Sequence, residues 1–450
     1  MQLVVLNTFY NVYKLHFQQQ GKKNFDKFFD KSVINKLGKS SGFVFRTAQK
    51  ITRYHFVLGF LSSSCKKQTS FSGWAMQTGM LSGNTVSRQA LFERIHEGTV
   101  EFAKSLVKRV LLAQSVKGFS TDLFAKFKKV LLQDSTTLRL PQVLSNIFPG
   151  NHSRGAQKAV ARIQGIIDIK AMKFIDFVLA AFTQNDQSAS GSIIDLVKKG
   201  DLVIRDLGYF AIGTFEKLLA KEVDFLSRLK YGVGLYDENG SPIRIKDLMK
   251  QKKPIDRWVF IGAKKQIWVR LVMLPLPAKQ VAEKIRKAKQ DRDKRLNHST
   301  GYYQWLGYSV YITSVKQEVW TAQGAAKAYR VRWQIEIIFK SWKTGFHMQE
   351  ILHEGCTNQY RVKVSIYLLL LFMCLFMQKI DVHYRHAIEK KNKKIISIMK
   401  LANFIGKNFL EIFLLTPAKM KGLIIHYCCY EKRNDRINMT DLYQNFEPLA

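Results

Sequence analysis

The sequence has few cysteines, few acidic residues and no hydrophobic run long enough to cross a membrane. Its five cysteines form no Cys-x-x-Cys pair and have no histidine at zinc-finger spacing, which excludes the common structural zinc sites and indicates a reducing compartment. The longest apolar run, residues 364–377, has 14 residues, against the roughly 20 that span a bilayer. The N-terminus lacks the features of a signal peptide. We therefore expect no membrane association and interpret residues 364–377 as a buried core helix.

The shortage of acidic residues leaves a large positive charge. Lysine and arginine number 72 against 34 aspartates and glutamates, so the formal net charge is +38. Such an excess attracts polyanions, of which nucleic acid is the commonest. A ribosomal or membrane-surface protein would also be basic, but ribosomal proteins of 450 residues are rare. With 46% hydrophobic residues the chain is expected to fold, into two or three domains. The composition favours a protein that processes nucleic acid.

The N-terminal quarter of the chain is predicted to be helical. Residues 1–110 contain Phe-rich amphipathic stretches, and residues 83–98 have a plausible helix start at Asn84 or Thr85, followed by the basic Arg88. This segment could be the reading helix of a helix-turn-helix motif. The alternative is a helix that only packs into the core, which is the commoner role of an amphipathic helix.

From about residue 128 the pattern changes to short strands. Residues 129–141, 159–170 and 173–182 are typical of neighbouring strands in a meander. A helical crossover is predicted at 192–200, before a fourth strand at 201–210. Three strands, a crossover and a fourth strand predict a mixed α/β sheet.

A different block follows between about residues 231 and 310. It contains a predicted hairpin at 257–274 that turns near Gly262, a strongly basic helix at 278–295 and a strand at 307–315. We interpret this block as an insertion in the α/β domain. From about residue 320 the chain is predicted to be helical again, and it ends in a basic region.

The segment 328–343 carries the most informative pattern. On an α-helix, with about 100° between successive residues, one narrow face collects a phenol, two cations and a carboxylate. These four residues are Tyr329, Arg332, Glu336 and Lys343. The opposite face is apolar and is made of Val331, Ile335, Ile338 and Trp342. A solvated face with an ordinary ion pair four residues apart is the alternative interpretation.

Aspartates in apolar strand segments are the second unusual feature. Asp134 lies inside the run VLLQDSTTL, and Asp206 directly follows LVIR. A carboxylate at a buried strand position is costly unless it is paired or binds a metal. Each could also be a turn or cap residue. Asp168, in GIIDIK, is a similar strand aspartate. Its position alone makes it as good a candidate as Asp134 and Asp206.

The two features together resemble a known family. The spacing Tyr-x₂-Arg-x₃-Glu-x₆-Lys in segment 328–343 resembles the YREK signature of bacterial insertion-sequence DDE transposases, insertion sequence family four. The DST at 134–136 resembles the first catalytic motif of that family, and the RDLGYF at 205–210 resembles the second. FLSRLK at 225–230 and YITSV at 311–315 match the usual surroundings. The resemblance covers roughly residues 70–380.

The resemblance implies a fold and a domain organisation. It implies an α/β chain with a ribonuclease H-like mixed-sheet catalytic core and a mainly β insertion, flanked by helical N- and C-terminal regions. The expected division is a DNA-end-binding region at 1–110, a catalytic domain at 111–380 that holds the insertion at 231–310, and a basic helical region at 381–450. The 130-residue interval from Asp206 to Glu336 has room for such an insertion.

The resemblance also implies an activity and its site. A DNA transposase of this kind binds terminal inverted repeats, hydrolyses them with two metal ions and joins the ends to target DNA. The implied catalytic and metal-binding residues are Asp134, Asp206 and Glu336. The implied DNA-binding residues are Tyr329, Arg332 and Lys343. Asp168 matches no catalytic position of the family.

The expected cofactor is a pair of Mg²⁺ ions, for which Mn²⁺ can substitute. The expected partners are the transposon ends and the target, both double-stranded DNA, and a second copy of the chain in a homodimer. The expected location is the bacterial cytoplasm, associated with the nucleoid. Two rival hypotheses remain at this point: a nuclease that joins nothing, and a non-catalytic DNA-binding protein derived from a transposase.

Overall fold

The structure, a computed structural model, describes most of the chain. The described residues are 30–43, 50–67, 69–113, 119–120, 122–153, 156–262, 267–290, 298–353, 355–392, 394–409, 411–430 and 447–448. Within them, no helix has both the length and the apolar character needed to span a membrane.

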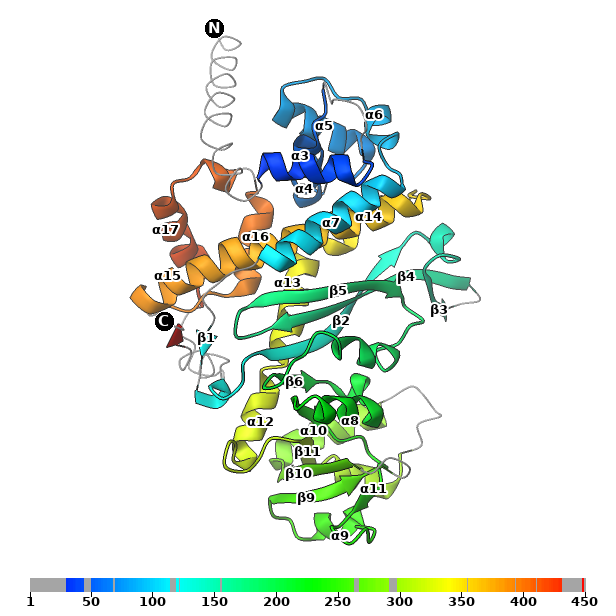
Figure 1. Cartoon of the computed structure of the whole chain (residues 1–450), viewed down its shortest axis with the longest axis vertical. Coiled ribbons are helices and arrows are strands. Elements are labelled where there is room, and N and C mark those ends of the chain that lie inside the picture. The colour runs from blue at the N-terminus through cyan, green and yellow to red at the C-terminus, as the bar shows by residue number, and fades with distance from the viewer. Residues whose placement is uncertain are drawn as a thin grey trace.

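Among the described residues, 30–113 and 322–427 are mainly helical, and Figure 1 shows most of these helices above the strands. The N-terminal helices are α3 (Lys31–Ser40), α4 (Arg53–Cys65), α5 (Phe71–Ser82), α6 (Arg88–Phe92) and α7 (Glu97–Ala113). The central helices are α8 (Ile212–Ala220), α9 (Ile245–Lys250), α10 (Ala278–Lys289), α11 (Thr300–Trp305), α12 (Ala322–Arg330) and α13 (Trp333–Gly345). The C-terminal helices are α14 (Gln359–Leu375), α15 (Val382–Asn392), α16 (Ile398–Lys407) and α17 (Pro417–Tyr427).

One mixed sheet of ten strands forms the middle of the molecule. Its strands are β2 (Val130–Leu140), β3 (Pro149–Ser153), β4 (Ala156–Asp168), β5 (Lys173–Ala181), β6 (Leu202–Arg205), β7 (Asp224–Arg228), β8 (Leu235–Tyr236), β9 (Ile255–Ile261), β10 (Ile267–Pro275) and β11 (Tyr308–Thr313). Two short strands, β1 (Phe119–Ser120) and β12 (Glu447–Pro448), pair with each other outside this sheet.

The strand order confirms the predicted ribonuclease H-like core. Strands β5, β4, β2, β6 and β7 are neighbours in this order, with β4 antiparallel to β2, and with β2, β6 and β7 mutually parallel. The predicted meander of three strands and the fourth strand are therefore confirmed. The predicted crossover helix at 192–200 is wrong, because the segment forms a 3₁₀-helix at Ser188–Ile193 followed by turns.

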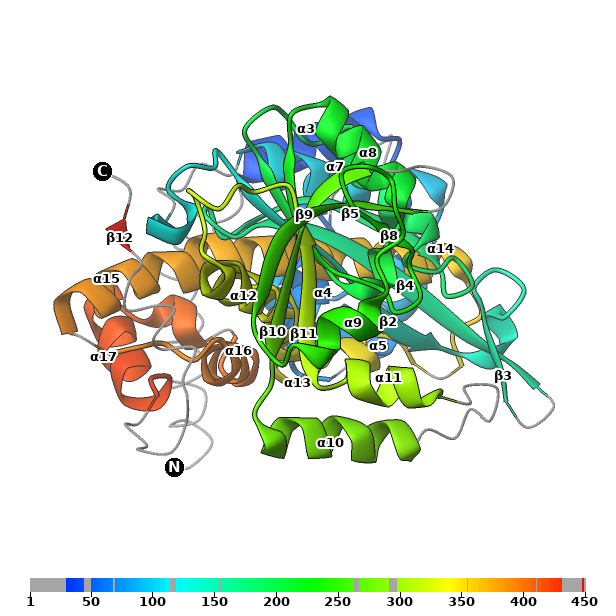
Figure 2. The same ribbon diagram turned by 90° about the horizontal axis from the view of Figure 1, so that it is seen from below.

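The inserted block continues the core sheet. Strand β11 pairs with β7 in antiparallel fashion, and β10, β9 and β8 follow in order. The predicted hairpin is β9 and β10, and the predicted basic helix is α10. Figure 2 shows α10 along the rim of this part of the molecule, and none of its residues is buried. The last residues predicted for this helix, 291–295, lie outside the described residues.

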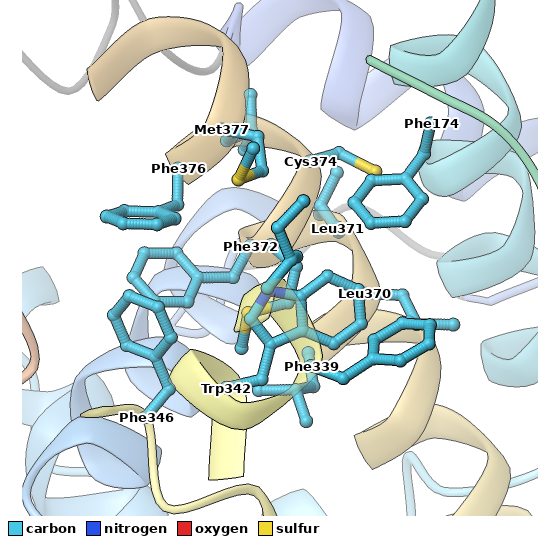
Figure 3. Close-up of a cluster of buried hydrophobic side chains, with 14 of the residues drawn as sticks. Phe174, Phe339, Trp342, Phe346, Leu370, Leu371, Phe372, Cys374, Phe376 and Met377 are labelled. Carbon is cyan, nitrogen blue, oxygen red and sulfur yellow. The ribbon is translucent and has the colours of Figure 1, made fainter. Parts of the chain in front are cut away.

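Alternate residues of the strands pack into two cores on opposite faces of the sheet. On β2, Val130 and Leu132 belong to the larger core, which also contains α13 and α14, whereas Leu131 belongs to the smaller core with α8. Figure 3 shows part of the larger core, where Trp342 of α13 lies among aromatic and aliphatic side chains of α14. The apolar run 364–377 is buried there, as predicted.

The helical ends differ from the prediction in one place. Residues 83–98 do not form a single reading helix, because Gly83 ends α5 in the left-handed conformation and α6 has only five residues. The domain limits stay a prediction. Helix α7 packs along α14 in the centre of the molecule (Figure 1), and a π-helical segment joins α14 to α15 across residue 380.

Candidate active site

The register of two parallel strands brings Asp134 and Asp206 together. Gln133 on β2 pairs with Arg205 on β6, and the two aspartates are the next residues of their chains. Asp134 shares a strand face with Val130 and Leu132, which pack against α13. The sheet thus directs Asp134 towards the helix that carries Glu336.

The helix predicted for residues 328–343 is broken at Val331 and Arg332. Helix α12 ends at Arg330 and α13 begins at Trp333. Between them the backbone forms hydrogen bonds of the 3₁₀ type, from an N–H to the carbonyl three residues earlier, including Arg332 N–H to Tyr329 O at 3.1 Å. A continuous helix was therefore wrong. The predicted apolar face is confirmed, because Val331, Ile335, Ile338 and Trp342 are all buried.

The guanidinium of Arg332 lies between the three predicted catalytic carboxylates. Its Nη1 is 2.5 Å from Glu336 Oε1 and 3.8 Å from Asp134 Oδ2. Its Nε is 3.7 Å from Asp206 Oδ1. The Arg332 side chain is only 8% exposed, whereas its partners Asp206 and Glu336 are 40% and 37% exposed, so only the guanidinium side of these ion pairs is buried. One buried cation thus gathers residues that are 72 and 130 positions apart in the sequence.

Tyr329 and Lys343 complete the predicted set. The Tyr329 hydroxyl donates a hydrogen bond to Asp206 Oδ1 at 3.1 Å, and its ring packs against Tyr311 of β11. Burial, together with Asp206, raises the pKa of Tyr329, so the phenol stays protonated and remains a donor. Burial lowers the pKa of Lys343, against an attraction to Asp134. Tyr329 and Arg332 therefore contact the cluster formed by Asp134, Asp206 and Glu336, and the charge of Asp134 acts on Lys343.

The environment of Asp134 opposes its ionisation. Its side chain is 17% exposed, compared with 40% for Asp206 and 37% for Glu336. Burial raises the pKa of Asp134 to about 7, and the charges of Glu336 and Asp206 act in the same direction. The Ser135 amide, which donates to Asp134 Oδ1 at 2.8 Å, and the Arg332 charge act against this rise. Asp134 therefore gains most from a bound cation.

The donor set of this cluster fits a divalent ion. Three carboxylates offer only oxygen ligands, which suit Mg²⁺ and Mn²⁺. Among the described residues, no three acidic, histidine or cysteine side chains already form a metal cage. The negative charge of the three carboxylates is instead partly offset by Arg332, whose place a cation could take if the guanidinium moved aside.

Asp168, the other strand aspartate, has a different surrounding. It is buried at the end of β4, and its carboxylate accepts hydrogen bonds from the Val130 and Lys170 amides at 3.4 and 3.1 Å. It satisfies backbone donors and faces no other acidic site residue, which agrees with its absence from the family pattern.

Sequence reasoning missed a polar layer behind the two aspartates. Five residues of this layer contact one another or the loop after β5: Gln133, Ser135, Arg162, Asp186 and Arg205. A signal was present, because a large polar residue directly precedes each aspartate in an otherwise apolar strand, in LLQD and in VIRD.

Comparison with known proteins places these residues in a family. A family model described as the transposase DDE domain matches residues 125–377, which include all three carboxylates. The chain is 28% identical over 359 residues to the transposase of insertion sequence element IS231F from Bacillus thuringiensis subsp. israelensis, with 74% of each chain covered. It is 25% identical over 352 residues to the transposase of IS1151 from Clostridium perfringens, covering 73% of this chain and 74% of that protein.

A solved structure is also similar. The piggyBac transposase synaptic complex with hairpin DNA matches 93% of this chain and 87% of that chain, with a TM-score of 0.46 and 9% sequence identity. This likeness is too weak to support an inference about the site. The family match extends over more than half of the chain. The chain therefore belongs to the DDE transposase family and is a metal-dependent enzyme that cuts and joins DNA.

Proposed function

We propose that Asp134, Asp206 and Glu336 are the catalytic metal ligands of this transposase. The observation that carries the proposal is the contact of one guanidinium, that of Arg332, with all three carboxylates. Asp134 within β2, Asp206 directly after β6 and Glu336 on α13 converge there, at the point where the parallel pairing of β2 and β6 stops. Asp134 would be shared by both ions, Asp206 would hold one ion and Glu336 the other.

Two Mg²⁺ ions, or Mn²⁺ in their place, would supply positive charge at the attacking and leaving oxygens of the phosphodiester. The protein contributes the shape and charge of the surroundings. The buried carboxylate of Asp134 and the half-exposed carboxylates of Asp206 and Glu336 leave one side of the cluster open to DNA.

The cations of the site are proposed to hold phosphates. When the carboxylates bind metal, Arg332 is free to turn its planar guanidinium to a phosphate, which it can grip with two parallel hydrogen bonds. Lys343, whose ammonium is partly desolvated, supplies a second positive charge on the same helix. Tyr329 remains protonated and donates a hydrogen bond, either to Asp206 or to a terminal phosphate.

The substrates proposed are the terminal inverted repeats of the element and a target duplex. The helical N-terminal region is proposed to bind the ends. The described residues contain one such acidic cluster in each chain, and an element has two ends. We therefore propose that two copies of the chain pair the ends as a homodimer.

Strand transfer with a pre-cut end tests this function. A duplex that carries the terminal repeat and already ends in its 3′-hydroxyl is incubated with Mg²⁺ and a plasmid target, so that joining is measured without prior cleavage. The wild type is expected to join the end to the plasmid. The Asp206→Ala variant is expected to bind the end and to join nothing.

The outcomes separate the proposed function from its rivals. Cleavage of intact ends without joining of pre-cut ends would indicate a nuclease. Binding without either reaction would indicate a DNA-binding protein that has lost activity. Joining by Asp206→Ala at the wild-type rate would remove Asp206 from the catalytic set.

A further inference from the structure

Behind the two strand-borne aspartates lies a layer of buried polar side chains. Gln133 and Arg205 form the last register pair between β2 and β6. Both side chains are completely buried. Because successive side chains of a strand point to opposite faces, these two lie on the face away from α13, while Asp134 points towards it. Gln133 and Arg205, which directly precede the two aspartates, thus lie buried on the opposite face of the sheet.

The guanidinium of Arg205 joins the two strands. Its Nη2 donates to Gln133 Oε1 at 2.6 Å and also to the carbonyl of Ser190. Gln133 in turn donates from Nε2 to Ala189 O and to Ser192 Oγ, both at 3.1 Å. Strands β2 and β6 are therefore tied to each other and to the 3₁₀-helix Ser188–Ile193 directly before the two aspartates.

The residue after Asp134 is held from the same side. Ser135 Oγ donates to Asp186 Oδ1 at 2.8 Å. Asp186 Oδ1 also accepts hydrogen bonds from Arg162 Nη1 at 2.7 Å and from Gln164 Nε2 at 3.0 Å. Asp134 therefore lies between two residues that are both fixed to the segment 186–192. Its backbone cannot shift along the strand without breaking this layer.

Stability does not account for Arg205. It makes no ion pair with a carboxylate among the described residues, and its Nε and Nη1 have no hydrogen-bond partner there. Burial lowers its pKa to about 10, which reflects the cost of placing the charge in the interior. The hydrogen bonds to Gln133 and Ser190 offset this cost only in part, because a buried charge without an opposite charge is expensive. A role other than stability is indicated.

We propose that Arg205 is a positioning residue that fixes the separation of Asp134 and Asp206, and thereby the affinity of the site for divalent ions. This inference rests on the proposed function of the two aspartates as metal ligands. Arg205 touches neither substrate nor metal in this account. It acts through Gln133 and the backbone of β6, because loss of the bridge lets the end of β6 move away from β2.

The test measures binding of Mn²⁺ alone, in the absence of DNA, to the full chain. In Arg205→Met the half-saturating Mn²⁺ concentration, followed by the electron spin resonance signal of the free ion, is expected to rise about tenfold or more. The melting temperature is expected to change little, because removal of the buried charge offsets the loss of its two hydrogen bonds. Arg205→Lys, which keeps the charge and can reach one acceptor, is expected to give an intermediate rise.

Arg270→Met is the matched control. Arg270 is also completely buried in the sheet, but its Nε and Nη2 both donate to Asp256 at 2.6 Å, and its strand β10 is the third along the sheet from β6. This variant is expected to lower the melting temperature, because Asp256 loses its partner, and to leave Mn²⁺ binding unchanged. A merely structural role for Arg205 would give the same pattern as Arg270.

Wild-type Mn²⁺ binding by Arg205→Met would overturn the inference. Asp134→Ala shows which proposal has failed: if it abolishes Mn²⁺ binding while Arg205→Met does not, only the positioning role is wrong. If Asp134→Ala also binds Mn²⁺ normally, the proposed metal ligands are wrong. Should Arg205→Met not fold, Mn²⁺ binding is measured with Gln133→Met, which removes the acceptor on β2 and leaves the charge in place. Weaker binding supports the inference, and wild-type binding overturns it.

Discussion

Arg332 shows how a single residue can hold an acidic cluster together. Three carboxylates in one place repel one another, and the guanidinium between them reduces this repulsion. It also lies between the carboxylates that would hold the ions. Binding of a divalent ion therefore requires Arg332 to move, and the residue competes with the metal before it can assist with phosphate.

This competition predicts the effect of Arg332→Met on metal binding without DNA. Removal of the guanidinium leaves the carboxylates uncompensated, so the variant should bind Mn²⁺ more tightly than the wild type. The gain is expected to be about 1 kcal/mol, a modest value because Asp206 and Glu336 are more than a third exposed. Titration calorimetry with Mn²⁺ measures it.

The same variant is expected to engage cut DNA ends less well, because the phosphate-binding guanidinium is missing. Glu336→Gln serves as the control, since it removes a proposed ligand and should weaken Mn²⁺ binding. Weaker Mn²⁺ binding by Arg332→Met would show that Arg332 supports the metal site directly and does not compete for it.

At the scale of helices and strands, the position of Glu336 depends on how α13 packs. Gly345 near the end of α13 lies against α16, where an added Cβ would be 2.7 Å from the backbone carbon of Ala402 and 2.9 Å from the nitrogen of Asn403. Backbone atoms cannot rotate away as a side chain would. The close crossing of α13 and α16 therefore requires glycine at this position.

Gly345→Ala should separate the two helices and destabilise the protein by about 1–3 kcal/mol. Denaturant unfolding measures the loss, and cleavage should fall with it because α13 carries Glu336. Gly422→Ala in α17 is the control, because an added Cβ there meets nothing within 4 Å. That variant should be neutral or slightly more stable, since alanine is the better helix former. Equal stability of the two variants would contradict the packing account.

The sequence predicted elements well where one local pattern determines them. The strands around Asp134 and Asp206 follow from short apolar runs, and the buried face of α13 follows from the spacing of Ile335, Ile338 and Trp342. The break at Val331 was not predicted, because no glycine or proline marks it. It depends on tertiary contacts, in which Tyr329 packs on Tyr311 and Arg332 turns to the carboxylates.

The contacts within the site could be predicted only in part. The spacing of Tyr329, Arg332, Glu336 and Lys343 indicated one shared surface, and the family resemblance supplied the two aspartates. The bridge between Arg205 and Gln133 depends on the parallel register of β2 and β6. Register between strands 72 residues apart is not a local property of the sequence.

At the scale of the whole molecule, charge is the dominant feature. The net charge of +38 spreads over a chain whose three proposed catalytic residues are all acidic. A general positive field attracts DNA, and the local acidic cluster attracts metal ions to the point where DNA is cut. Helix α10 extends the basic surface at the rim of the sheet, where its lysines and arginine remain exposed or half-buried.

This charge predicts a steep dependence of DNA binding on salt. The affinity for a terminal-repeat duplex is expected to fall by about a thousandfold or more between roughly 50 and 200 mM salt, because each contacted phosphate releases counterions. Fluorescence anisotropy with Ca²⁺, which should permit binding without cutting, measures it. A nearly flat response would contradict binding through the phosphate backbone.

The central claim is that Asp134, Asp206 and Glu336 cut DNA together with divalent ions. The most direct test is cleavage of a labelled fragment that carries the terminal repeat of the element itself, with Mg²⁺ or Mn²⁺, by the wild type beside the three alanine variants. The account predicts cutting at the repeat boundary by the wild type alone, with DNA binding retained in all four proteins. Cutting at the wild-type rate by any one variant would contradict the claim.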